Sequence, residues 1–146
     1  MNLGLTPDEL TQYVKLPKHL ASKDYLQPFY GHPEWGVRSV FSGYLGWYDG
    51  NPTNLFRLSP KDEAERFAKL LGGKGILLAG AKAALSDDDN QWAPQLADRL
   101  IAMDPGDQQA KEIKAAALVR LARNSVNATA RNYFLTVARE LREAAE

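Results

Sequence analysis

The sequence predicts an all-α protein, a helical bundle with TPR-like antiparallel helix hairpins. Helix-capping residues recur along the chain, each followed by a helical run. One such run ends at the glycine pair Gly72-Gly73, and another ends at the Asp104-Pro105 pair. No long run alternates apolar and polar residues as a half-buried strand does. The 146 residues fit one domain. We divide it into an N-terminal helical arm, residues 1–58, and TPR-like helices, residues 59–146.

The arm opens on a strong helix-start signal. Thr6 stands at an N-cap position, Pro7 at the first helical position, and Glu9 where a capping box places its carboxylate. We expect this short helix to end before Pro17. The pattern becomes helical again from about Glu34 to Tyr48, and this second helix is unusually rich in glycine and aromatic residues.

Small residues recur through that second helix at spacings of three and four, which places them on one helical face. They are Gly36, Ser39, Gly43, Gly46 and Gly50. Glycine costs about 1 kcal/mol relative to alanine inside a helix, so the stripe predicts close approach of another backbone. Aromatic and β-branched residues fill the other faces, which predicts a helix buried nearly all round. We expect the close-packing or dimer interface to comprise Gly36, Ser39, Gly43, Gly46, Trp47 and Tyr48.

The second half of the chain is more regular. Ser59 caps a helix that stops at Gly72-Gly73, and a second helix spans about 74–85. The segment SDDDN caps a third helix, which ends near Met103. The segment DPGD turns into a fourth over about 106–123, and NSVNAT opens a fifth. This alternation of helices and short turns is typical of TPR-type hairpins, although the strict repeat consensus is absent.

Composition excludes several classes of function. Eighteen basic residues balance eighteen acidic ones, which argues against a nucleic-acid partner. No apolar run reaches the roughly 20 residues that span a membrane, and we expect no membrane partner. Two histidines and no cysteine are too few for a self-contained zinc site, so no metal ligand or cofactor is assigned. The first residues lack signal-peptide features, so we expect a cytoplasmic location, with export possible if an N-terminal portion is missing.

Several polar residues of the arm have both a functional and a structural interpretation. His32 delivers a polar group to a site or simply caps and packs a loop. Arg38 binds an anion or pairs with Glu34 one helical turn earlier. Tyr44 lines an apolar channel or belongs to the core. An enzyme that acts through Tyr30, His32, Glu34 and Arg38 would need these residues preorganised around a pocket.

Four stretches carry a family resemblance when taken in order. They read GLTPDEL, YGHPEWGVRSVFSGYLGWYDGNPTNL, QWAPQLADRLIAMDPGDQQAKEIKAAAL and NATARNYFLTVAREL. Together they resemble the dimerisation domain of the alkyl sulfatases, zinc-dependent enzymes of the metallo-β-lactamase fold that release sulfate from alkyl sulfate esters. The resemblance covers nearly the whole chain, and GWYDGNPTNL and ARNYFLT are its most specific parts.

The resemblance implies a non-catalytic domain that forms a homodimer with intertwined arms. In the family an N-terminal catalytic domain carries the zinc ligands, and a sterol-carrier-like domain follows the dimerisation domain. We expect both to be absent from this chain. No catalytic residue is therefore assigned here, and the catalytic metallo-β-lactamase-fold domain becomes an expected partner, in cis or as a separate chain.

The resemblance also implies that the aromatic segment lies near the catalytic cleft of the intact enzyme. The residues that would line this cleft are His32, Trp35, Arg38 and Tyr44. Some family members carry a histidine where Trp35 stands in this sequence. The alternative function is a stand-alone TPR-like adaptor, which would bind a peptide or another protein in a helical groove.

Overall fold

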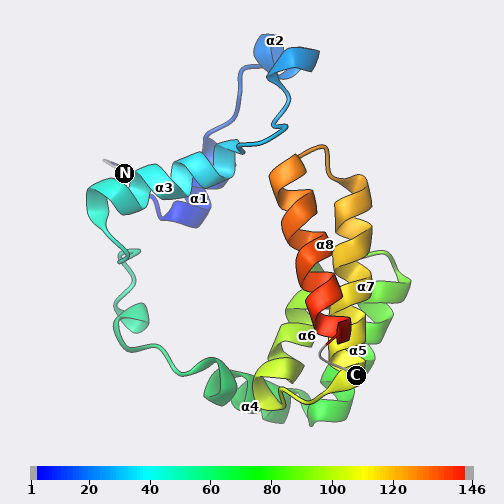
Figure 1. Ribbon diagram of the computed structural model, residues 1–146. Helices are drawn as coiled ribbons and strands as arrows, with labels where there is room; N and C mark the ends of the chain where they lie inside the picture. Colours follow the sequence, from blue (N-terminus) through cyan, green and yellow to red (C-terminus); the bar gives the residue numbers. More distant parts are fainter. Residues whose placement is uncertain (1–2, 144–146) are drawn as a thin grey trace. The chain divides into compact units, whose positions relative to one another are not determined.

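A computed structural model describes residues 3–143, and within that range all regular structure is α-helix or 3-10 helix. The predicted all-α class is therefore confirmed (Figure 1). The chain forms two compact units. The first runs to Arg57 and includes Val126–Thr129, which comprises the first two residues of the last helix and the two residues before it. The second comprises Leu58–Ser125 and the residues from Ala130 onward.

The first unit contains the helices α1 (Pro7–Tyr13), α2 (Lys18–Ala21) and α3 (Pro33–Leu45). Two 3-10 helices, η1 (Asp24–Leu26) and η2 (Pro52–Phe56), complete it. The helices α1 and α3 pack against each other. Leu10 and Phe41 are the buried hydrophobic side chains of this pair, and Arg38 of α3 forms an ion pair with Asp8 of α1.

The predicted start of α1 is confirmed in atomic detail. The Thr6 hydroxyl accepts a hydrogen bond from the Glu9 backbone N–H at 3.3 Å, and the Glu9 carboxylate accepts one from the Thr6 backbone N–H at 2.8 Å. These bonds, led by the one from the Thr6 backbone, lower the pKa of Glu9. The helix ends at Tyr13, before Pro17 as expected.

The aromatic helix is shorter than the sequence predicted. It ends at Leu45, and Gly46 closes it with a φ of +77°, a conformation that favours glycine. Gly50 also has a positive φ, of +91°. These two glycines therefore serve the backbone geometry of the helix end and the following turn. Trp47 and Tyr48 follow the helix, so the predicted extent to Tyr48 is wrong.

The expectation that this helix is buried nearly all round is also wrong for the single chain. Phe41 is its one buried residue, at 5% exposure. Tyr44 is 79% exposed, and Val40 and Leu45 are exposed as well. The sequence pattern predicted several apolar faces, but among residues 3–143 only the face that carries Phe41 is buried.

The second unit contains the longer helices α4 (Pro60–Leu71), α5 (Lys74–Ser86), α6 (Trp92–Met103), α7 (Gln108–Asn124) and α8 (Ala128–Glu143). Consecutive helices from α4 to α7 pack against one another, an arrangement compatible with TPR-like hairpins. Their core includes Leu77 and Leu100 together with many alanines, whose small side chains bring the helix axes close. The last helix packs through Ala138 beside Ala115 and Leu118 of α7.

Caps and ion pairs define the turns of this unit. Ser59 caps α4, and Gly72 ends it in the left-handed conformation, both as predicted. Asp107 caps α7 by accepting the Ala110 N–H at 3.0 Å, and its carboxylate lies 2.9 Å from Lys74 Nζ. The Ala110 N–H and then Lys74 lower the pKa of Asp107.

Candidate interaction surface

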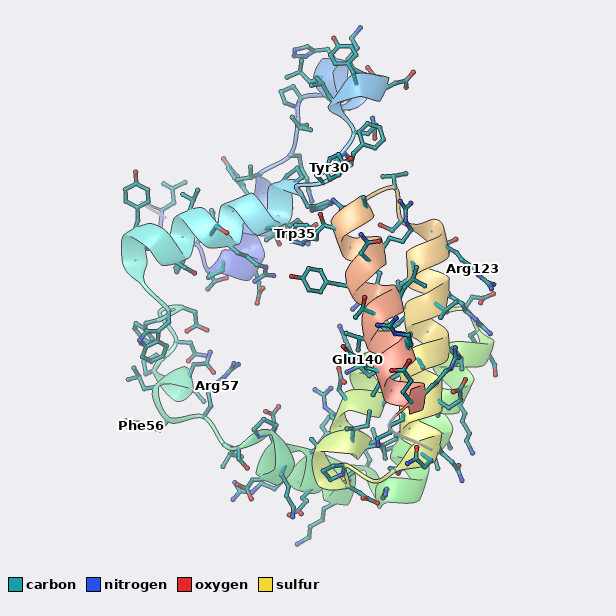
Figure 2. The ribbon with its side chains drawn as sticks, in the orientation of Figure 1. Tyr30, Trp35, Phe56, Arg57, Arg123 and Glu140 are labelled. Carbon is teal, nitrogen blue, oxygen red and sulfur yellow. The ribbon has the colours of Figure 1, made fainter. Side chains whose placement is uncertain are left out.

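Exposed apolar side chains dominate the first unit. Between Leu3 and Phe56, fifteen large hydrophobic residues are exposed, whereas the large hydrophobic residues buried in that range are Leu10 and Phe41. Figure 2 labels Tyr30, Trp35 and Phe56, three of the exposed aromatic residues. A monomeric domain normally buries the greater part of such a set, so this surface needs a cover. We call these exposed residues of the first unit the aromatic surface.

The predicted small-residue face of α3 is open within the chain. A Cβ atom added at Gly36 or at Gly43 would meet no heavy atom within 4 Å. Ser39 lies between them on the same helix and is exposed. Among residues 3–143, none therefore uses the close approach that these glycines permit.

The residues after α3 form a hydrogen-bonded loop that presents two aromatic rings. Asp49 accepts the Asn51 backbone N–H at 3.0 Å and also accepts the side-chain amide of Asn54. These two donors, the backbone one first, lower the pKa of Asp49. The rings of Trp47 and Tyr48 pack edge to face with centroids 5.9 Å apart. Trp47 is nonetheless 74% exposed.

His32 has the capping role that was the structural alternative for it. It is the N-cap of α3, and its Nδ1 accepts the Glu34 backbone N–H at 3.3 Å. Its ring lies 5.7 Å from the Trp35 ring, between centroids. Pro33 occupies the first helical position. A histidine engaged in this way positions the start of the helix.

Arg38 pairs with Asp8 rather than with Glu34, the partner expected from helical spacing. Its Nη2 donates to Asp8 Oδ1 at 2.6 Å, and both side chains are largely solvent-exposed. Among the described residues, no hydrogen bond joins the side chain of His32 to that of Arg38 or Tyr30. The arm therefore gives no support to the hypothesis of a preorganised catalytic cluster.

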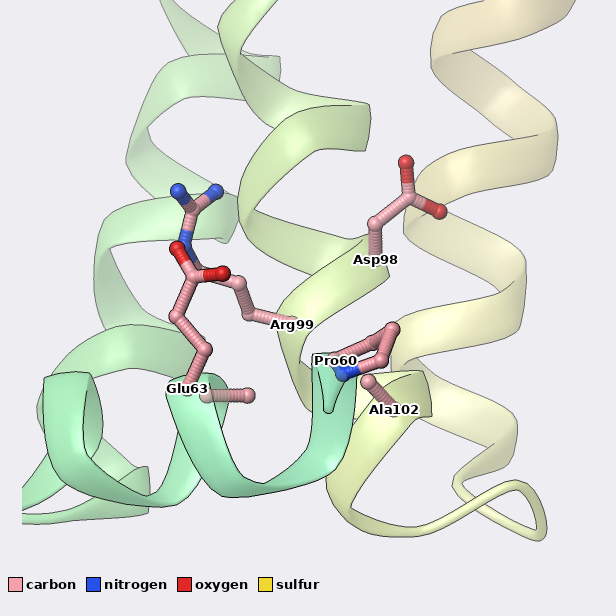
Figure 3. Close-up of a pocket in the computed structure, with 6 residues that line it drawn as sticks. Pro60, Glu63, Asp98, Arg99 and Ala102 are labelled. Atoms are coloured by element: carbon pink, nitrogen blue, oxygen red, sulfur yellow. The ribbon is translucent and has the colours of Figure 1, made fainter. Parts of the chain in front are cut away.

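The pocket between α4 and α6 offers no such cluster either. It is lined by Pro60, Glu63, Ala64, Asp98, Arg99 and Ala102 (Figure 3). Two of its charged groups are already engaged: Asp98 pairs with Lys114 at 2.6 Å, and Arg99 lies 4.9 Å from the centre of the Phe67 ring. A shallow apolar hollow in the first unit is lined by Phe41, Leu45 and Tyr48, among others.

No three His, Cys, Asp or Glu side chains between residues 3 and 143 come together as the ligands of a metal ion would. The described residues thus do not supply the ligand set of the zinc ion that the sequence resemblance implies. Over the same range, no helix is both long and apolar enough to cross a membrane.

The sequence interpretation missed residues that shape this surface. The sequence analysis did not predict the hydrogen-bond network of Asp49, Asn51 and Asn54, although aspartate and asparagine beside glycine and proline are typical of side-chain-capped turns. Asn127 was placed only in the segment NSVNAT that opens the fifth helix. Its side chain instead bonds to the loop before α3, a contact that no local signal in the sequence predicts.

Comparison with known proteins places the chain in a family. The family model described as alkyl sulfatase dimerisation matches residues 6–144, almost the entire chain. The chain belongs to the alkyl sulfatase dimerisation family. The resemblance expected from the four sequence stretches is therefore confirmed.

Individual members of the alkyl sulfatase group agree with this assignment. A linear primary-alkylsulfatase from Pseudomonas is 43% identical over 97% of this chain. An (R)-specific secondary-alkylsulfatase from Pseudomonas is 39% identical over 97%. The structure of the stereoselective inverting sec-alkylsulfatase Pisa1 from Pseudomonas covers 100% of this chain at 38% identity, with a TM-score of 0.90.

The chain corresponds to only part of each relative. It spans 27% of the primary-alkylsulfatase, 22% of the secondary-alkylsulfatase and 23% of the Pisa1 chain. As an alkyl sulfatase dimerisation domain, it therefore matches one region of larger proteins.

Proposed function

We propose that this alkyl sulfatase dimerisation domain pairs with a second copy of itself through the aromatic surface and catalyses no reaction alone. The observation that carries the proposal is the excess of exposed over buried large side chains in the first unit. The family assignment supplies the partner, because a dimerisation domain is expected to meet its own copy.

The energetics favour such pairing. A fully buried large apolar side chain contributes about 1.5–3 kcal/mol. Four such side chains from each of two copies would together contribute about 12–24 kcal/mol, against roughly 4–15 kcal/mol lost in association. The gain exceeds the cost over most of these ranges, and the aromatic surface offers fifteen such residues on each copy.

In the intact protein, we propose that this domain accompanies a zinc-dependent alkyl sulfatase domain, in cis or on a separate chain. The start and the exposed face of α3 would then help to wall its cleft, through His32, Trp35, Arg38 and Tyr44. Trp35 and Tyr44 are exposed and available for an alkyl chain. Arg38 would have to exchange its ion pair with Asp8 for a substrate sulfate.

The primary test is the solution mass of the chain, measured by light scattering on a sizing column across a dilution series. We expect twice 16.2 kDa at high concentration. Replacing Trp47 by serine should raise the dissociation constant, because an exposed interface ring is lost. Replacing Leu70 by serine is the matched control, since Leu70 is 82% exposed but belongs to the second unit. A chain that stays monomeric at every concentration would contradict pairing and favour the adaptor alternative.

A second assay tests the absence of catalysis. The purified chain, with and without added zinc, is incubated with octyl sulfate and free sulfate is measured. We expect no release above the rate in buffer. Release in proportion to the amount of chain would overturn the non-catalytic part of the proposal.

A further inference from the structure

Four consecutive backbone carbonyls in the first unit converge on one asparagine and its neighbour. Asn127 Nδ2 donates to the carbonyl oxygens of Pro28 at 2.6 Å, Tyr30 at 3.1 Å and Gly31 at 3.2 Å. The Ala128 backbone N–H donates to the fourth carbonyl, that of Phe29, at 2.6 Å. We call this arrangement the carbonyl ring.

A side-chain amide at the centre of this ring offsets the electrostatic repulsion between its carbonyl oxygens. Carbonyl oxygens that converge repel one another unless a donor lies between them. The Asn127 side chain is 4% exposed, so water does not readily take that place. Its amide group has two hydrogens for three acceptors, and one hydrogen must therefore be shared. Aspartate has the same shape but presents only acceptors to the ring.

The carbonyl ring lies immediately before the aromatic helix. Residue 31 is followed by His32, the N-cap of α3, and by Pro33 at its first position. The 126–129 segment belongs to the same compact unit as the 28–31 loop, although more than 90 residues separate the two in the sequence. The place where α3 begins is thus set by a donor from a distant part of the chain.

We propose that Asn127 is a positioning residue that holds the 28–31 loop and the start of α3 in place through its side-chain amide. Its consequence for pairing rests on the proposed function, because α3 carries part of the aromatic surface. The proposal also explains the sequon-like Asn127-Ala128-Thr129 run, since the nitrogen that would carry a glycan is the donor to the ring.

The test compares amide hydrogen exchange in the full chain and in three variants, Asn127→Asp, Asn127→Ala and Asn132→Ala. Asn132 is an exposed asparagine of α8, the helix that begins directly after Asn127, and serves as the control. The reporters are two backbone amides. The Ala128 N–H donates to a carbonyl of the ring, and the Gly36 N–H donates to the backbone carbonyl oxygen of His32 at 3.1 Å. We expect both to exchange about tenfold faster or more in the two Asn127 variants.

The two Asn127 variants should also differ in how much they accelerate amide exchange, in an order that side-chain shape alone does not predict. Asn127→Asp should be at least as disruptive as Asn127→Ala, because its carboxylate would face the three carbonyl oxygens to which the asparagine amide donates. Amides of 60–124 should keep their protection in all variants. Unchanged exchange of Ala128 and Gly36 in Asn127→Asp would overturn the proposal. Equal loss of protection across 60–124 would overturn it as well, since the effect would then be general destabilisation.

The dissociation constant of the dimer, from the dilution series, gives a readout separate from local protection. We expect it to rise about tenfold or more in Asn127→Asp. An unchanged constant despite faster exchange would refute the role in pairing. A monomeric unmodified chain would refute the proposed function alone, because the exchange comparison can be made equally well in a monomer.

Discussion

The substitution Gly43→Leu separates the intrinsic stability of the chain from its pairing. Among the described residues, a Cβ atom added at Gly43 meets no heavy atom within 4 Å. Gly43 lies inside α3, where glycine costs about 1 kcal/mol relative to a good helix former such as leucine. We therefore expect the substitution to leave the helix of the isolated chain intact or slightly more stable.

Pairing should respond in the opposite direction. If two copies approach through the small-residue face of α3, each brings one new leucine into a packed contact. A twofold interface places both in equivalent positions, and each overpacked side chain costs about 1–3 kcal/mol. The expected loss is about 2–6 kcal/mol of association free energy. At about 1.4 kcal/mol for each factor of ten, the dissociation constant rises about 30-fold at the lower limit.

The assay combines the light-scattering dilution series with far-UV circular dichroism melts of the same samples. Gly75→Leu is the matched control, because Gly75 lies in α5, is exposed, and also has open space around it. The reasoning predicts weaker pairing for Gly43→Leu and unchanged pairing for Gly75→Leu. Equal dissociation constants for both variants and the unmodified chain would refute the assignment of this face to the interface.

Three further predictions concern the stability of the chain itself. Leu100→Ala, at a position with 0% exposure, should lower the free energy of unfolding by about 2–5 kcal/mol in urea titrations, whereas Leu70→Ala at the surface should change it by less than about 0.5 kcal/mol. Thr6→Ala should cost about 0.5–2 kcal/mol through loss of the capping box, measured as faster amide exchange in α1. The pKa of Asp107 is lowered in the folded state by the N-terminus of α7 and then by Lys74, so its contribution to stability is present above its unfolded pKa, near 3.8, and is lost as pH falls through the lower folded value. In thermal melts across a pH series, Asp107→Asn should reduce the fall in melting temperature at acidic pH. An unchanged fall would show that this carboxylate contributes nothing to it.

Local features of this protein could be predicted well from the sequence. The capping box at Thr6, the cap at Ser59 and the glycine stop at Gly72 all appear where expected. Each depends on hydrogen bonds between residues only a few positions apart, so the necessary partners are visible in a short stretch of sequence. The family resemblance also rested on contiguous stretches, and the family match confirms it.

Periodicity was less reliable at the end of α3. Glycines at spacings of three and four suggested one continuous face as far as Gly50. The structure ends the helix at Leu45, where Gly46 adopts a positive φ. A glycine that permits close packing and one that ends a helix look alike in a sequence, because both are defined by the missing side chain. The small-residue and cleft-lining assignments stay predictions until pairing is measured.

By itself, the sequence determined the helical class, the local caps and the family, because short-range hydrogen bonding and contiguous motifs encode them. Only the tertiary structure showed that Arg38 pairs with Asp8, that Asn127 holds a loop from the opposite end of the chain, and that the apolar faces of α3 stay largely uncovered. Those facts depend on contacts between distant residues. An apolar side chain shows that a cover is needed, but not whether the same chain supplies it.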